Sequence, residues 1–418
     1  MFLRKIDERI KIVFIILLIL FIFIILRVFY VQMIDYKKLN EYASDLWSRD
    51  LPLEADRGLI LDRNGVVLAD NLTTTSLVLI PNQIKNKKKT TKLLADILEV
   101  SYEDMKEHVY KETSIERVHP EGRRLSYDIA EKISNLKLDG VYLVKESKRY
   151  YPYGNMLSHA LGYVGIDNQG LSGLELQYDE YLTGKSGAIK YFSDAKGNKL
   201  NLSDIYVEPQ DGMNISLTID INIQKSLERE LDNIVDMFSP DMALAIVMDP
   251  NNGEILGMAS RPDYDPNNYQ DYSQETLSRN FPIWASYEPG STFKIITMSA
   301  AVEEGVVNLT KDHFYDSGSV NVDGSTLRCW KAGGHGDQTF LQVLQNSCNP
   351  GFVKLGQLLG KETLFDYIDK FGFGNKTGVD LNGEGEGIIF NLNQVGNVEL
   401  ATTAFGQGVS VTPIHLVV

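Results

Sequence analysis

The chain has 418 residues, of which 43% are hydrophobic and 10% aromatic, and its formal net charge is −15. This length is enough for two or three domains, and the excess of negative charge argues against a nucleic-acid partner. The two cysteines and six histidines do not follow a metal-binding spacing, so we predict no structural metal and no metal cofactor.

An apolar run, Ile12 to Val31, follows an N-terminal flank with four basic residues. About 20 residues cross a bilayer, so the run predicts a transmembrane anchor in which Arg27 reaches the outer interface. A cleaved signal peptide is the alternative, but no small-residue cleavage site follows and the run is too long for one. The basic flank predicts a cytoplasmic N-terminus and an extracytoplasmic remainder.

The segment 55–69 is predicted to be a β-hairpin, because apolar residues alternate on both sides of Asn64-Gly65, a strong turn signal. Its charged residues are expected to pair within the fold. The lysine-rich segment 85–92 is interpreted as a solvated loop, and residues 93–137 as helical. Glycines between 162 and 173 indicate tight turns at a packed junction, where His159 is expected to pack rather than to catalyse.

Beyond residue 210 the pattern predicts a mixture of strands and helices. Residues 211–220 alternate as a strand, and residues 223–238 carry a helical pattern. Two apolar segments, 243–248 and 254–259, flank a turn sequence that contains Pro250 and Gly253, and they are predicted to form an antiparallel pair.

The sequence Glu-Pro-Gly-Ser-Thr-Phe-Lys ends at Lys294. Apolar residues recur at helical spacing after Ser291, so Ser291 is predicted to lie in the first turn of a helix that ends near Gly305. Lys294 then shares its helix face. A serine becomes nucleophilic when a base removes its proton, and a lysine can be that base if burial lowers its pKa.

A Ser-x-x-Lys pair alone is a weak signal, since a capped surface helix with a solvated lysine has the same spacing. Ser193-Asp-Ala-Lys196 also matches, without an apolar helix behind it. The support for the first pair is the later sequence Ser347-Cys348-Asn349, which is predicted to be a turn between two helical segments. Ser278-Arg-Asn280 and Ser319-Val-Asn321 share this spacing but lack the two helices.

The order of these two motifs resembles that of serine penicillin-recognising enzymes, and the sequence around Ser291 resembles the class B penicillin-binding proteins. The cysteine pair and the residues around Ser347 resemble the sporulation-type members. The resemblance implies an α+β fold in three parts: a cytoplasmic tail and transmembrane helix at 1–35, an elongated mixed pedestal (dimerisation) domain at 36–210, and a transpeptidase domain, a β-sheet with a helical cluster, at 211–418.

The resemblance also implies the chemistry. Ser291 would attack the carbonyl between the two terminal D-alanines of a peptidoglycan stem peptide, with Lys294 as the base, and an amine of a neighbouring stem would accept the acyl group. Ser347 would relay a proton to the leaving nitrogen, and Asn349 would hold the substrate amide and orient Lys294. β-Lactams would acylate Ser291. The implied partners include the lipid bilayer and a glycosyltransferase, and no cofactor is implied.

The third motif of the family, Lys-Thr-Gly, is not assigned to Lys376-Thr377-Gly378. This sequence lies too close to the Ser347 turn and is flanked by glycines, as in a structural loop of class B enzymes, so Lys376 is expected to be solvated. The segment 404–413 resembles family sequence that leads towards the true motif. We therefore expect the chain to be truncated before the third motif, with an incomplete transpeptidase domain. In the family, the strand just after the third motif supplies one donor of the oxyanion hole. Its loss would lower the rate about 10²–10³-fold.

The two cysteines, Cys329 and Cys348, are predicted to lie outside the membrane, where disulfides persist. A bond between them would close a loop across the Ser347 turn and displace Ser347 and Asn349. This suggests a redox switch that is active when reduced and inactive when oxidised. The alternative is a pair of buried free thiols.

Two other functions remain open. A β-lactamase or β-lactam sensor uses the same Ser-x-x-Lys pair, although the long segment 36–210 argues against both. The second is a non-catalytic membrane scaffold of a wall-synthesis complex.

Overall fold

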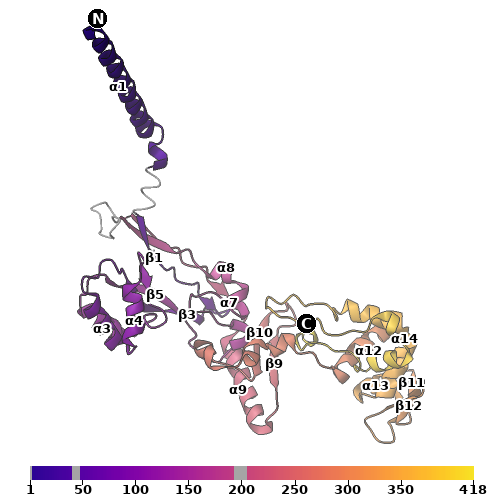
Figure 1. Ribbon diagram of the computed structural model, residues 1–418. Helices are drawn as coiled ribbons and strands as arrows, with labels where there is room; N and C mark the ends of the chain where they lie inside the picture. Colours follow the sequence, from indigo (N-terminus) through magenta and orange to yellow (C-terminus); the bar gives the residue numbers. More distant parts are fainter. Residues whose placement is uncertain (1, 40–47, 193–204) are drawn as a thin grey trace. The chain divides into compact units, whose positions relative to one another are not determined.

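The computed structural model describes residues 2–39, 48–192 and 205–418 (Figure 1). The chain divides into two compact units that alternate along the sequence. Unit 1 takes residues 1–55, 73–146 and 185–210, and unit 2 takes residues 56–72, 147–184 and 211–418. The comparison sequence Ser193-Asp-Ala-Lys196 lies outside the described residues.

The N-terminal helix α1 spans Phe2–Met33. Its part Phe14–Met33 has a mean hydropathy of 3.1, and none of this part is buried. A helix of this length and composition can cross a membrane, in agreement with the predicted anchor.

Unit 1 combines an antiparallel sheet with a helical layer. The sheet has the order β1 (Ser48–Leu53), β6 (Gly187–Phe192) and β7 (Ile205–Val207). The helices are α3 (Lys87–Leu98), α4 (Tyr102–Tyr110) and α5 (Tyr127–Asn135). The short strand β4 (Glu116–Arg117) pairs with the end of β3 (Val67–Leu79), and β5 spans Val141–Tyr150. Apolar side chains of β3 and the three helices form the core of this unit.

The lysine-rich segment is a helix start, and our interpretation of residues 85–92 as a loop is wrong. Helix α3 begins at Lys87, because the Asn86 side chain accepts a hydrogen bond from the amide of Lys89 at 3.1 Å. An asparagine at this position caps a helix, and the buried Thr90 and Thr91 hold its first turns against the core. The predicted helical segment 93–137 is also interrupted, between α4 and α5.

Unit 2 begins with the predicted hairpin. Strand β2 (Ile60–Leu61) pairs antiparallel with β3, with Ile60 opposite Ala69, and Gly65 has φ 84° in the turn. Strand β2 also pairs in parallel with β8 (Ile215–Ser216). The predicted strand 211–220 is therefore reduced to two residues.

The next predicted elements of unit 2 are confirmed. Helix α9 (Ile221–Phe238) starts at the cap Asp220, whose side chain accepts a hydrogen bond from the amide of Asn222. Strands β9 (Ala243–Met248) and β10 (Ile255–Arg261) form the expected antiparallel pair.

The charged residues of the hairpin segment pair inside unit 2, as predicted. Arg57 Nε donates to Glu175 Oε2 at 2.6 Å, and Arg149 Nε donates to Glu175 Oε1 at 2.6 Å. All three side chains are at most 2% exposed. Asp62, also buried, accepts hydrogen bonds from three backbone amides, those of Asn64, Val66 and Ile221.

The glycine-rich junction after residue 149 is closely packed. It holds the short helices α6 (Ser158–Leu161), α7 (Gly173–Gln177) and α8 (Asp179–Leu182). Gly162 has φ 77°, and a Cβ there would lie 1.8 Å from the carbonyl oxygen of Ser172. Only glycine fits such a position, so the predicted tight junction is confirmed.

The rest of unit 2 is a helical cluster with two small strand pairs (Figure 1). Its helices are α10 (Gln274–Ser278), α11 (Phe281–Trp284), α12 (Lys294–Glu303), α13 (Phe340–Gln345), α14 (Asn349–Lys370) and α15 (Asn397–Thr403). Strand β11 (His313–Asp316) pairs with β14 (Gly336–Thr339), and β12 (Ser319–Val322) pairs with β13 (Ser325–Arg328).

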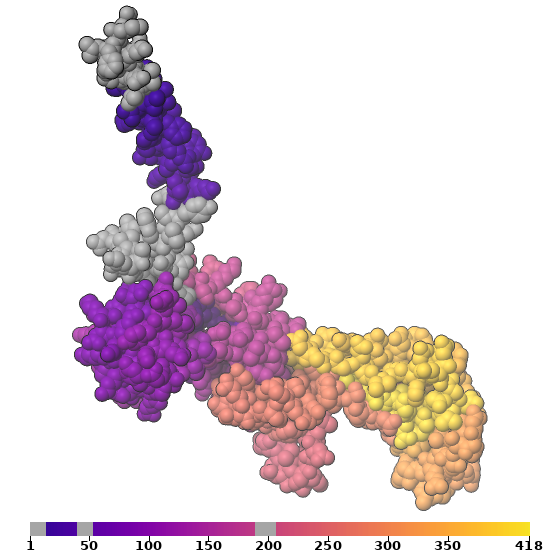
Figure 2. All heavy atoms as spheres, in the orientation of Figure 1, coloured from indigo at the N-terminus to yellow at the C-terminus, as the bar shows by residue number. Residues whose placement is uncertain are grey.

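One core joins α12, α13, α14 and α15, and this part of the chain is the light-orange-to-yellow mass of Figure 2. Phe293 and Ala300, from the turn before α12 and from α12 itself, pack against residues of α14 and α15, including Phe352 and Ala401. The family resemblance also implies that the helix after Ser291 packs on the β9–β10 pair. This expectation is wrong, because α12 packs chiefly on α14. The helices and small sheets together confirm the α+β class.

Candidate active site

Ser291 lies at the start of the predicted helix. Residues Gly290–Phe293 form a 3₁₀ turn that continues directly into α12, and Gly305 with φ 65° follows the end of the helix. Ser291 is exposed. Within the described part of the chain its hydroxyl makes no hydrogen bond, so it is available to a substrate.

The turn that carries Ser291 rests on the segment 404–408. The amide of Gly290 donates to the carbonyl of Gly406 at 2.9 Å, and a Cβ on Gly406 would lie 2.0 Å from the Gly290 carbonyl oxygen. Glu288 accepts a hydrogen bond from the amide of Gly408 at 2.8 Å. The sequence identified 404–413 only by resemblance. The structure shows that this segment positions the nucleophile turn.

Lys294 is 2% exposed although it carries an ammonium group. Its Nζ donates to Asn349 Oδ1 at 2.7 Å, to the Ser347 carbonyl at 2.8 Å and to Ser347 Oγ at 3.0 Å. All three acceptors are uncharged. Burial without a carboxylate partner disfavours the charged form, and it lowers the pKa of Lys294 to about 8.

Ser347 and Asn349 lie in the predicted turn between two helices, α13 and α14. Ser347 has φ 49°, which is uncommon for a residue other than glycine and points its carbonyl and hydroxyl at the same amine. Cys348 is the N-cap of α14, and Asn349 is its first residue. The Asn349 Nδ2 donates to the carbonyl of Arg328 at 3.1 Å, which fixes the amide with its oxygen towards Lys294. The structure thus brings Lys294, Ser347 and Asn349 together, as predicted.

The two cysteines are free thiols in the structure. Cys348 is buried and Cys329 is half-buried. Cys348 Sγ donates to Asp316 Oδ2 at 3.3 Å, and Cys329 Sγ lies 3.4 Å from His335 Nδ1. Neither Asp316 nor His335 was predicted from the sequence to be a functional residue.

The rejected Lys376-Thr377-Gly378 motif is a structural loop, as predicted. Thr377 donates from its amide and its hydroxyl to Glu384, at 2.7 Å and 2.6 Å. Lys376 is exposed. These contacts close the loop on itself.

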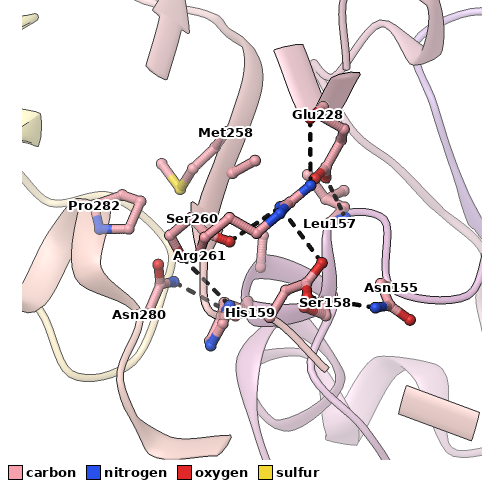
Figure 3. A pocket seen from close by; sticks show the side chains of 13 residues that line it. Asn155, Leu157, Ser158, His159, Glu228, Met258, Ser260, Arg261, Asn280 and Pro282 are labelled. Atoms are coloured by element: carbon pink, nitrogen blue, oxygen red, sulfur yellow. Dashed lines mark hydrogen bonds and ion pairs between the residues drawn. The ribbon is translucent and has the colours of Figure 1, made fainter. Parts of the chain in front are cut away.

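His159 is buried in a polar cluster that contains none of the four predicted catalytic residues (Figure 3). Its Nε2 lies 2.9 Å from the Thr276 carbonyl, and burial lowers its pKa. Beside it, Arg261 pairs with Glu228 and Asp232, both at 2.7 Å. The pocket in this region is lined by none of the four predicted catalytic residues. His159 is thus buried and hydrogen-bonded, as expected of a packing residue.

Two family models match the chain. The penicillin-binding protein dimerisation domain matches residues 52–217, and the penicillin-binding protein transpeptidase domain matches residues 243–418. The second range contains Ser291, Lys294 and the Ser347 turn.

Curated relatives match across both ranges. The chain is 56% identical to stage V sporulation protein D of Bacillus subtilis over 392 residues, which cover 94% of this chain and 61% of that protein. It is 30% identical to the peptidoglycan D,D-transpeptidase FtsI of Escherichia coli, covering 93% of this chain and 66% of that protein. With FtsI of Buchnera aphidicola the identity is 31%, with coverages of 97% and 70%. The chain thus spans less than two thirds of the first two relatives.

Solved structures show the same fold. Penicillin-binding protein 2X from Streptococcus thermophilus superposes with a TM-score of 0.68 at 26% identity, covering 88% of this chain and 58% of that one. A peptidoglycan synthetase from Bifidobacterium adolescentis gives 0.67 at 25% identity, with coverages of 88% and 71%. Because both domain models match in order and a relative above 30% identity is covered over most of its length, this chain belongs to the class B penicillin-binding proteins.

Proposed function

We propose that the chain is a peptidoglycan D,D-transpeptidase of cell-wall or spore-cortex synthesis, in which Ser291 forms the acyl-enzyme. One observation carries the proposal. Ser347 and Asn349 hold the buried Lys294 amine, one turn from Ser291, through three acceptors that are all uncharged. This is the environment that a lysine base requires. The substrate class follows from the relatives named as D,D-transpeptidases.

In the proposed first step, Ser291 Oγ attacks the carbonyl carbon of the penultimate D-alanine and passes its proton to Lys294. A neutral lysine has two N–H groups and one lone pair, whereas three acceptors surround Nζ. The Ser347 hydroxyl is the only one of them that can also donate, so it can relay the proton to the leaving nitrogen. D-Alanine leaves, and the acyl group remains as an ester on Ser291.

In the second step, an amine of a neighbouring stem attacks the ester carbonyl. The cross-linking amide forms, and the proton that the amine loses returns to Ser291 Oγ through Lys294. Asn349 would bind the backbone amide of the donor peptide while its oxygen orients Lys294. β-Lactams would acylate Ser291 by the same first step.

Acylation by a penicillin is expected to become faster as the pH rises through about 8. The pKa of Lys294 is about 8 because of burial, and only the neutral amine can accept the serine proton. Below that pH the neutral fraction falls roughly tenfold per unit, and above it the rate levels off. Acylation rate constants of a fluorescent penicillin, measured between about pH 6 and 10, test this. A rate that is the same at pH 6 and 9 would contradict Lys294 as the base.

Mass spectrometry of the labelled protein tests the function itself. The chain, and in parallel a version extended past Val418, is incubated with a fluorescent penicillin, digested and mapped. We expect one adduct, on the peptide that contains Ser291. No adduct on either version, or an adduct on another residue, would overturn the proposal.

We also propose that Cys329 and Cys348 form a reversible disulfide that inactivates the site. Oxidation would remove two protons and two electrons, taken up by a disulfide of an exchange partner. Burial raises the pKa of Cys348 to about 12, so the half-buried Cys329 is expected to react first. Non-reducing peptide mapping, with penicillin labelling before and after a reductant, tests the switch. Equal labelling of the oxidised and the reduced protein would remove it.

The membrane arrangement is part of the proposal. Helix α1 would anchor the chain with its basic N-terminal flank in the cytoplasm, the segment 36–210 would act as a pedestal, and 211–418 would carry the site outside. Protease added to intact spheroplasts is expected to degrade residues after α1. Protection of these residues would contradict this topology.

A further inference from the structure

Four side chains with metal-binding atoms meet beside the Ser347 turn. They come from four separate places in the fold: the end of β11, the residue after β13, the residue before β14 and the N-cap of α14. We call them the four-ligand cluster: Asp316, Cys329, His335 and Cys348. Their ligand atoms all lie within 4.8 Å of one another.

Three of the six separations within the cluster are close to those of a small tetrahedral site. His335 Nδ1 lies 2.9 Å from Asp316 Oδ2, Cys348 Sγ lies 3.3 Å from the same oxygen, and Cys329 Sγ lies 3.4 Å from His335 Nδ1. Zinc bonds of 2.0–2.3 Å place tetrahedral ligand atoms about 3.3–3.8 Å apart. These three separations are within about half an ångström of this range, and all six are at most 4.8 Å. Side-chain movements of about 1 Å would complete the geometry.

The donor chemistry selects zinc among the common ions. Two sulfurs, one imidazole nitrogen and one carboxylate oxygen form a set that suits zinc, whereas magnesium and calcium prefer oxygen ligands alone. The carboxylate is already oriented, because Asp316 accepts hydrogen bonds from the amides of Gly318 at 2.8 Å and of His335 at 3.0 Å. Such outer contacts hold the ligands of metal sites in place.

The cluster is enclosed like a structural site. The side chains of Asp316 and His335 are 0% and 5% exposed and Cys348 is 0% exposed, whereas Cys329 is half-buried. The segment that the cluster ties down has little core of its own: from 317 to 335, Val322 is the one buried residue. Small segments of this kind are usually held by a metal or a disulfide.

We propose that the four-ligand cluster binds one zinc ion as a structural site. Binding would replace the two thiol protons, so the ion enters as the two protons leave and no electron is transferred. Since Cys348 lies between Ser347 and Asn349, the ion would fix the turn that holds Lys294. It would also occupy both sulfurs, so zinc binding and a Cys329–Cys348 disulfide would exclude each other. The proposal concerns metal binding and does not rest on the transpeptidase reaction.

Metal uptake by the purified chain tests the site. The reduced protein, in detergent with a non-chelating reductant, is equilibrated with Zn²⁺ or with Co²⁺ as a spectroscopic substitute, and unbound metal is removed. We expect one equivalent of metal by elemental mass spectrometry. The cobalt protein is expected to show the visible bands of a tetrahedral ion and a thiolate-to-cobalt charge-transfer band. These readouts do not depend on activity.

Ligand variants and a matched control sharpen the result. Cys329→Ser and His335→Gln are expected to weaken zinc binding more than tenfold. His313→Gln is expected to leave it unchanged, since His313 makes an equivalent 2.9 Å contact with Asp337 across β11 and β14 but has no thiol beside it. A wild-type chain that takes up no stoichiometric metal, or a cobalt spectrum without the charge-transfer band, would overturn the proposal, whether or not the variants fold.

Discussion

Replacing Ser291 by alanine is expected to abolish covalent labelling by a fluorescent penicillin. The Ser291 oxygen is the atom that would form the ester, and the neighbouring Thr292 hydroxyl is held by a hydrogen bond to the Pro289 carbonyl at 2.7 Å. The substitution should leave the fold unchanged, because the hydroxyl makes no hydrogen bond in the described part of the chain and is exposed. Gel fluorescence after denaturation measures the covalent adduct, and a melting curve checks the fold.

Ser278→Ala is the matched control for this experiment. Ser278 is also exposed and begins a Ser-x-Asn sequence, as Ser347 does, but it ends the short helix α10 and has no Lys three residues later. Labelling that survives in Ser291→Ala would show that another residue is acylated. A Ser291→Ala chain that supports full wall or cortex synthesis in cells would favour the scaffold function instead.

Replacing Glu175 by glutamine is expected to destabilise unit 2 by about 3–5 kcal/mol, the usual cost of removing one partner from a buried ion pair. The Glu175 carboxylate lies between Arg57 and Arg149, and all three side chains are buried. Arg57 keeps a second partner in Asp179, at 2.7 Å. Arg149 would therefore lose its carboxylate partner, and most of the destabilisation would come from its buried charge. Pulse proteolysis in increasing urea measures the shift.

Glu254→Gln provides the matched comparison. Glu254 pairs with Arg63 at 3.0 Å, but both side chains are about one-third exposed (38% and 34%). A pair of this kind contributes about 0–1 kcal/mol. Equal urea midpoints for the two variants would show that the buried charges around Glu175 are not needed for stability.

The parts of the site that the sequence predicted are local in the chain. Ser291 and Lys294 share one turn, and Ser347 and Asn349 share another, so helical period and turn signals were enough to place each pair. Lys294 contacts Ser347, which lies 53 residues further along the chain. We expected this contact only because the motif order resembles that of a known family. The spacing within each motif does not by itself predict that contact.

The four-ligand cluster could not be predicted from the sequence in this way. Asp316 reaches His335 across 19 residues and Cys348 across 32, through two strand pairs whose register the sequence did not reveal. Metal motifs are recognised when ligands recur at short, fixed intervals, and these ligands do not. The same limit applies to Arg57 and Glu175, which are 118 residues apart.

The alternation of the two units along the chain has a consequence for synthesis. Strand β2 of unit 2 must wait for β8, and the contact beside it, Leu59 to Asn214, joins residues 155 positions apart. At a translation rate of 5–20 residues per second, this delay is roughly 8–30 s. Residues 73–146 of unit 1 emerge in that interval and can fold around their own helical core. The nascent chain therefore keeps one edge of β2 unpaired while the helical part of unit 1 can already fold, so unit 1 starts to fold before unit 2 can close.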